Sequence, residues 1–276
     1  MPHYGYLLLL FALFVVPRIL QRFRVPTAIT SYALGALCGL ELGLFGDDAT
    51  VRLLATLGIV SLFLFAGLDV DLATLRREAR VLAQHVALQL AGLALVAWAA
   101  LRVFELDLRA ASLVALALLT PSTGFILDSL DGLGLPERAR FWIKSKAIAS
   151  ELVALAVLFV ALQSTSAMGL AGSTLAVAAL IALLPLAFRL FAAFVVPHAP
   201  KSEFAFLMML AVACAVVTYE LGVYYLVGAF LVGMVARRFR ERAPALASER
   251  MLDAVESFAS LFVPFYFFYA GLNLRP

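Results

Sequence analysis

The sequence places one carboxylate inside an otherwise apolar segment. Glu151 lies in RFWIKSKAIASELVALAVLFVAL, residues 140–162, about 11 residues after Arg140. If this segment is a helix that enters a membrane near Arg140, Glu151 lies ~16 Å deep, in the middle of the hydrocarbon layer. An unpaired carboxylate is costly at that depth, and such residues usually mark ion pathways or proton relays. A structural ion pair between helices is the alternative.

A second set of polar residues interrupts LVALALLTPSTGFILDSL, residues 113–130. Pro121 lacks an N–H and disfavours helical geometry at Thr120, and Gly124 follows shortly after. We therefore expect the helix to break here, near mid-membrane depth. The hydroxyl groups of Thr120, Ser122 and Thr123 would then lie beside freed carbonyls and two half-helix ends, a combination suited to a small desolvated cation. An ordinary proline kink is the alternative.

These two sets of residues predict one site, because both are expected at the same depth. Burial favours the neutral form of a carboxyl group, so a proton and a metal cation can compete for Glu151. Competition for one carboxylate that is exposed alternately to the two sides is sufficient for antiport. Ser150 is a further candidate ligand, and Lys144 and Asp128 are candidate auxiliary groups.

Such a site requires membrane-spanning elements to hold it. The composition is 64% hydrophobic and 14% charged, with a mean hydropathy of +1.02, well above that of soluble domains. We therefore expect a protein embedded in a lipid bilayer. The net charge of +3 comes from basic residues in short gaps between apolar segments, so nucleic acid is not an expected partner. No nucleophile–base pair, metal-ligand cluster or cofactor motif is visible, so neither an enzyme nor a bound cofactor is predicted.

Cutting the chain at charged and Gly/Pro-containing gaps predicts an all-α transmembrane domain over residues 1–276. The run from Phe204 to Ala236 is interpreted as two short spans, because the basic residues that flank it should lie on the same side. Basic residues concentrate in the gaps after odd-numbered spans, which predicts that the N-terminus is outside. The ten predicted spans are 4–20, 27–45, 51–68, 81–103, 110–130, 141–162, 170–196, 202–219, 221–236 and 254–274.

Two motifs recur in the second half of the chain. Ala66-Gly67-Leu68 matches Ala270-Gly271-Leu272, and YALGALCG (32–39) resembles YLVGAFLVG (225–233). Both pairs are seven spans apart, an odd number, so the copies should point in opposite directions. Inverted repeats are typical of secondary transporters, although Gly/Ala-rich segments also resemble one another by chance. The predicted organisation is a first repeat over 1–165, a linker helix over 170–196 and a partial second repeat over 202–276.

The same segments resemble the monovalent cation:proton antiporter superfamily, in particular its bacterial branch of potassium-efflux and sodium–proton exchangers. LFLFAGLDVDL (62–72), YELGVYYLVGAFLVGMVA (219–236) and PFYFFYAGLNL (264–274) carry the resemblance. LLTPSTGFIL and ASELVAL occupy the places of the family's unwound helix and of the helix with its essential acid. The resemblance implies that Glu151 binds sodium or potassium and protons, in a homodimer in a bacterial inner membrane.

The acidic site departs from the family pattern. The family usually has Asp there, preceded by Asp, Asn or Gln, whereas this chain has Ser150-Glu151. Ion selectivity therefore cannot be transferred, and a single carboxylate suggests electroneutral exchange. Two other functions stay open: a non-transporting subunit or sensor derived from the antiporter fold, and a sodium-coupled organic-anion symporter, whose repeats are five spans long.

The resemblance also implies a 13-helix fold, in which spans one to six pair with spans eight to thirteen. Counterparts of spans four to six are then missing from the second repeat. The sequence therefore predicts a chain truncated by about three helices, which does not transport on its own.

Overall fold

The computed structural model describes residues 3–23, 25–70, 79–121, 126, 135–163, 167–199, 202–220, 226–240 and 249–274. Within these ranges all regular secondary structure is helical, as expected of an all-α polytopic membrane protein. The ten α-helices described there correspond in order to the ten predicted spans. They are α1 (His3–Gln21), α2 (Thr27–Ala36) with a π-helical turn η1 (Leu37–Glu41), α3 (Ala49–Asp69), α5 (Ala79–Val103), α6 (Leu108–Leu119), α8 (Glu137–Gln163), α9 (Ala167–Leu190) with a π-helical turn η3 (Phe191–Val195), α10 (Glu203–Glu220), α11 (Leu226–Arg240) and α12 (Glu249–Leu272).

Six of the described helices are long and apolar enough to cross a membrane, namely α1, α3, α5, α9, α10 and α12. The remaining four helices are α2, α6, α8 and α11. The helices α2, α6 and α11 have 10, 12 and 15 residues, which is short for a full crossing. Helix α8 has 27 residues but also carries several charged side chains, including Glu151. Membrane crossing by these four helices stays a prediction.

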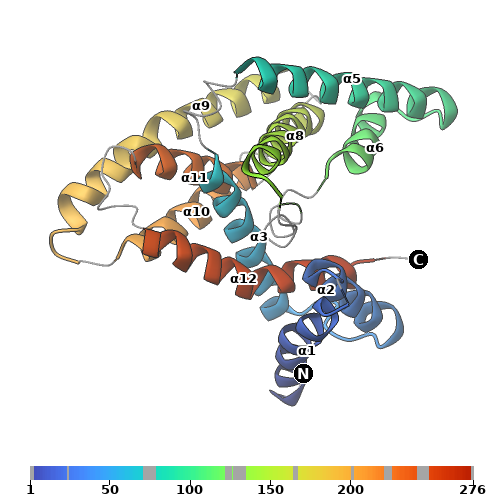
Figure 1. Ribbon diagram of the computed structural model, residues 1–276, viewed down its shortest axis with the longest axis vertical. Coiled ribbons are helices and arrows are strands. Elements are labelled where there is room, and N and C mark those ends of the chain that lie inside the picture. Colours follow the sequence, from blue (N-terminus) through green and yellow to red (C-terminus); the bar gives the residue numbers. More distant parts are fainter. Residues whose placement is uncertain are drawn as a thin grey trace.

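The helices form two groups (Figure 1). Helices α5, α6 and α8 pack against one another, and their main contact with the other group is between α8 and α9. The second group is built around α3, which packs against α10, α11 and α12. Its buried cluster combines side chains of α3, α9, α10 and α11, including Leu64, Leu184, Leu207 and Val232. In the first group, α6, which ends just before Pro121, and α8, which carries Glu151, thus pack against each other and against α5.

Glycines allow the backbones of the second group to approach closely. An added Cβ at Gly58 of α3 would lie under 3.0 Å from the carbonyl oxygen of Phe262 in α12. These two positions are 204 residues apart, the same separation as between Gly67 and Gly271 in the repeated motif. A residue that touches its own counterpart lies on the axis that relates the two repeats. The crossing of α3 and α12 is therefore where a pseudo-two-fold axis between two repeats would pass, and the inverted repeat itself stays a prediction.

The repeated motif makes the same contact in both halves. Gly67 of α3 faces the carbonyl oxygen of Phe230 in α11, and Gly271 of α12 faces the carbonyl oxygen of Tyr32 in α2. In each case an added Cβ would lie under 3.0 Å from that oxygen. The pair α3 and α11 is therefore repeated as α12 and α2. Helix α12 lies seven spans after α3 and α2 lies seven spans before α11, an offset of seven and not five as in the symporter alternative.

The sequence alignment of the second motif, residues 32–39 with residues 225–233, does not match the contacts in the structure. Gly35 of α2 faces the carbonyl oxygen of Phe268, and the contact that corresponds to it is made by Gly233, which faces the carbonyl oxygen of Leu64. Gly228, which the sequence pairs with Gly35, instead faces the backbone of α10. The alignment is wrong by five residues, because Gly228 and Gly233 lie in equally small, apolar surroundings and only tertiary packing distinguishes them.

Helices α2 and α12 run in the same direction. Gly35 faces Phe268 and Gly39 faces Leu272, so each step along one helix matches an equal step along the other. An even number of chain reversals must therefore separate them. This agrees with the interpretation of residues 204–236 as two short helices, since α10 ends at Glu220 and α11 begins at Leu226.

Asp48 joins α1 to the start of α3. Its Oδ1 accepts from the backbone N–H groups of Thr50 (2.9 Å) and Val51 (3.0 Å) as the N-cap, and its Oδ2 accepts from the Tyr6 hydroxyl of α1. The Tyr6 hydrogen bond is the main cause of a lowered pKa at Asp48, which desolvation opposes and the two backbone donors reinforce. Ionised Asp48 therefore stabilises this corner of the fold.

We expect Asp48→Ala to lower the free energy of unfolding by about 1 kcal/mol, because it removes the cap. A carboxyl group with a lowered pKa stabilises the fold above its unfolded-state pKa, and that stabilisation is lost as the pH falls through the folded-state pKa. The difference between parent and variant should thus be present at neutral pH and shrink below about pH 4. Denaturant titrations in detergent at several pH values measure it. Asp47→Ala is the control, and an equal loss there would contradict the capping role.

Candidate functional site

Helix α6 ends at Leu119, where Pro121 predicts a break. Thr120 has an extended backbone (φ −95°, ψ 106°), and its N–H donates to the carbonyl oxygen of Leu116 at 2.9 Å. Helix α6 starts at Leu108 and has only 12 residues, about 18 Å, which is shorter than a hydrocarbon layer of about 30 Å. If α6 enters the membrane near Leu108, as the sequence predicts, its helical geometry ends partway through that layer.

Glu151 lies near the middle of α8, which runs from Glu137 to Gln163. Its side chain is half-buried, and the preceding Ser150 is buried. Ala147, Ala149 and Val153 are also buried, so this stretch of α8 faces protein along much of its circumference. The carboxylate is thus held on a packed part of the helix and not on a fully exposed face.

A small apolar cluster brings the break and the acid-bearing helix together. Leu116 of α6 and Val153 of α8 belong to the same buried cluster as Leu93 of α5, and Leu119 and Ala154 pack against it. Val153 is two residues after Glu151, and Leu119 directly precedes Thr120. The end of α6 therefore lies level with the part of α8 that carries Glu151.

Helix α5 contributes polar groups to the same junction. The amide of Gln89 donates to the carbonyl oxygen of Leu119 in α6 at 3.1 Å, which is an interhelical hydrogen bond. One turn earlier, the Nε2 of His85 is buried without a hydrogen-bond partner among the described residues. Its ring instead packs edge-on against Trp142 of α8, with ring centroids 6.0 Å apart.

The other predicted site residues are only partly covered by the structure. Pro121 is described and exposed, next to the extended Thr120. Ser122, Thr123, Gly124 and Asp128 lie outside the described residues, as does the side chain of Lys144. Their roles at the site stay predictions.

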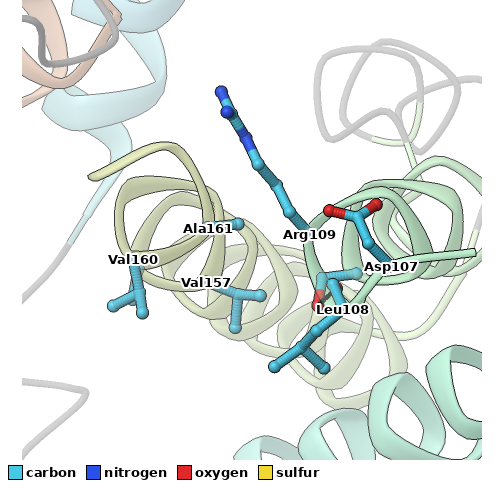
Figure 2. A pocket seen from close by; sticks show the side chains of 8 residues that line it. Asp107, Leu108, Arg109, Val157, Val160 and Ala161 are labelled. Atoms are coloured by element: carbon cyan, nitrogen blue, oxygen red, sulfur yellow. Dashed lines mark hydrogen bonds between the residues drawn. The ribbon is translucent and has the colours of Figure 1, made fainter. Parts of the chain in front are cut away.

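A pocket of about 700 Å³ lies between the start of α6 and the second half of α8. Figure 2 shows Val157 and Val160 of α8 on one side, and Asp107 and Leu108 at the start of α6 on the other. The Arg109 side chain extends away from the Asp107 carboxylate in this view (Figure 2). The carboxylate of Asp107 caps α6 by accepting from the backbone N–H of Ala110 at 3.1 Å.

Sequence reasoning does not find this pocket. Its lining joins residues 107–112 with residues 156–161, which no local pattern connects. The pocket begins five residues after Glu151 along α8, about 8 Å, on the side of the predicted outer surface. It is therefore distinct from the junction at Thr120.

The family is decided by a comparison of the sequence with known protein families. The family model described as the transmembrane region of the sodium/hydrogen exchanger matches residues 8–276, nearly the whole chain. The chain belongs to this family. The membership confirms the resemblance to cation:proton antiporters and agrees with a polytopic membrane protein.

Among individual proteins, the sodium/hydrogen exchanger segment described here is similar to the probable Na(+)/H(+) antiporter 3 of Methanocaldococcus jannaschii. The two sequences are 36% identical over 81 residues. This match covers 28% of this chain and 20% of the relative, so it spans about a fifth of that protein's length.

Proposed function

We propose that this protein exchanges a monovalent cation, sodium or potassium, for protons across a membrane by alternating access. The cation and the proton would bind in turn to Glu151, with Ser150 and the hydroxyl groups of Thr120, Ser122 and Thr123 as further ligands. Membership of the sodium/hydrogen exchanger family supports the reaction class. The non-transporting alternative has no comparable support.

The observation that carries this proposal is the packing of an interrupted helix against the acid-bearing helix. Helix α6 ends at Leu119, and the cluster around Leu116 and Val153 keeps that end level with Glu151. Freed carbonyl groups and a negative helix end attract a cation that has lost part of its hydration shell. A carboxylate at the same depth supplies the charge and can bind a proton instead.

Proton flux in proteoliposomes tests the proposal. A protein that contains residues 1–276 is reconstituted with a pH-sensitive dye inside the vesicles, and a sodium or potassium gradient is imposed. We expect the lumen to change pH with one or both ions and not with a choline gradient. Absence of flux with both ions would contradict the proposal. The expectation that residues 1–276 alone do not transport stays a prediction.

We further propose that the N-terminus is outside and that the protein lies in a bacterial inner membrane. The basis is the excess of Arg and Lys after the odd-numbered predicted spans, including Arg237, Arg238 and Arg240 at the end of α11. Alkaline phosphatase inserted at Arg240 should be inactive, because it would stay in the cytoplasm. An active fusion would reverse the orientation. A homodimer is also proposed, on the family resemblance alone, and the mass of the purified protein in detergent tests it.

A further inference from the structure

Gln89 of α5 makes a hydrogen bond to the broken end of α6. Its Nε2 donates to the carbonyl oxygen of Leu119, which is 30 residues away in the sequence. A carbonyl oxygen can only accept, so the amide nitrogen must face Leu119 and the amide oxygen must point elsewhere. The bond is therefore a directional contact between two helices and not a local helix cap.

The acceptor, the carbonyl oxygen of Leu119, has no hydrogen-bond donor available within its own helix. The last four carbonyl oxygens of a helix lack an intrahelical partner. At the end of α6, Leu116 accepts from the N–H of Thr120, and Leu119 accepts from Gln89. An orphan carbonyl in the hydrocarbon region is strongly unfavourable, so this bond fixes the direction in which the chain leaves α6. Thr120 is the first residue after the end of α6.

Two buried polar atoms near the same junction have no hydrogen-bond partner in the described part of the chain. They are Oγ1 of Thr120 and Nε2 of His85, which lies one turn before Gln89 on α5. Buried polar atoms are normally paired, and those that are not require an explanation such as a bound ion or water. Gln89 therefore holds a helix end whose neighbouring polar groups are still free to accept a ligand.

We propose that Gln89 is a positioning residue for cation exchange. By anchoring the carbonyl group of Leu119, it keeps Thr120 and the freed carbonyls of α6 opposite the Glu151 region of α8. The inference rests on the proposed function, since it assigns Gln89 a part in that same site. Gln89 acts through the backbone of α6 and needs no contact with the ion.

The first test replaces Gln89 by Leu in the full-length transporter. We expect the apparent KM for the cation to rise about tenfold, because the ion ligands are no longer held in place, while kcat changes by less than about threefold. Gln84→Leu is the matched control, because Gln84 is an exposed glutamine on the same helix. It should keep the parental KM.

The second test replaces Gln89 by Glu and measures the pH profile. An ionised carboxylate cannot donate to Leu119 and repels its carbonyl oxygen, whereas a protonated carboxyl group can donate as the amide does. We expect the ratio of variant to parental kcat/KM to rise several-fold between about pH 8 and about pH 6. His85 on α5 and Glu151 on α8 are present in both proteins, so the ratio cancels their contribution to the pH profile.

The outcomes separate this inference from the proposed function. A parent with no flux in either ion overturns the proposed function and this inference with it. A parent that exchanges ions, with an unchanged KM in Gln89→Leu, overturns this inference alone. If Gln89→Leu does not fold, Gln89→Glu decides, and a ratio that does not change with pH overturns the role.

Discussion

Replacement of Glu151 by Gln is expected to abolish cation-driven proton flux and to leave the fold intact. The substitution keeps the volume of the side chain but removes the group that binds a proton or a cation in turn. A neutral amide also suits a half-buried position in the membrane, so expression and detergent stability should change little. The measurement is flux in proteoliposomes at equal protein content, with size-exclusion profiles of both proteins.

Two variants make this result specific. Glu151→Asp keeps the charge on a shorter side chain and should retain part of the activity. Glu137→Gln removes a carboxylate from the first turn of the same helix, which is outside the packed region, and should exchange ions like the parent. Parental flux in Glu151→Gln would mean that Glu151 is structural, and the proposed mechanism would then be wrong.

Much of the fold follows from local patterns in the sequence. Apolar segments of about 20 residues predict the number and order of the ten described helices, because backbone groups in a bilayer must be satisfied within each segment, although α2, α6 and α11 are shorter than predicted. Pro121 predicts the end of α6 to within two residues, because it removes a hydrogen-bond donor and restricts Thr120. The motif at Gly67 and Gly271 also makes the contacts expected of a repeat.

Other features depend on contacts between distant helices, which local patterns do not specify. The counterpart of Gly35 is Gly233 and not Gly228, because helix register is chosen by which carbonyl group each glycine faces. The sequence does not identify Leu119 as the acceptor of the Gln89 amide, because the two residues lie on different helices. Ser122, Thr123, Gly124 and Asp128 lie outside the described residues, so their roles at the site are still predictions from the sequence.

The contacts at Gly67 and Gly271 give the second large prediction. Gly67→Ala should lower the free energy of unfolding by about 1–3 kcal/mol or more, since the new Cβ meets the backbone of α11 at Phe230. A backbone carbonyl cannot rotate away as a side chain can, so α3 and α11 must separate. Gly271→Ala should cost a similar amount, because it forces α12 away from Tyr32 of α2 in the same manner.

The relation between the two motifs also predicts the stability of the double variant, which carries both Gly67→Ala and Gly271→Ala. Gly67 and Gly271 each lie nine residues, about 13 Å, from the crossing of α3 and α12 at Gly58 and Phe262, on opposite sides of it. Their effects should therefore add to within about 0.5 kcal/mol.

Gly172→Ala on α9 is the control, because an added Cβ there meets nothing within 4 Å, and its stability should equal or slightly exceed that of the parent. Unfolding of the purified proteins in mixed micelles, followed by circular dichroism, measures all four variants. Losses no larger at Gly67 and Gly271 than at Gly172 would contradict the close packing of the two repeats.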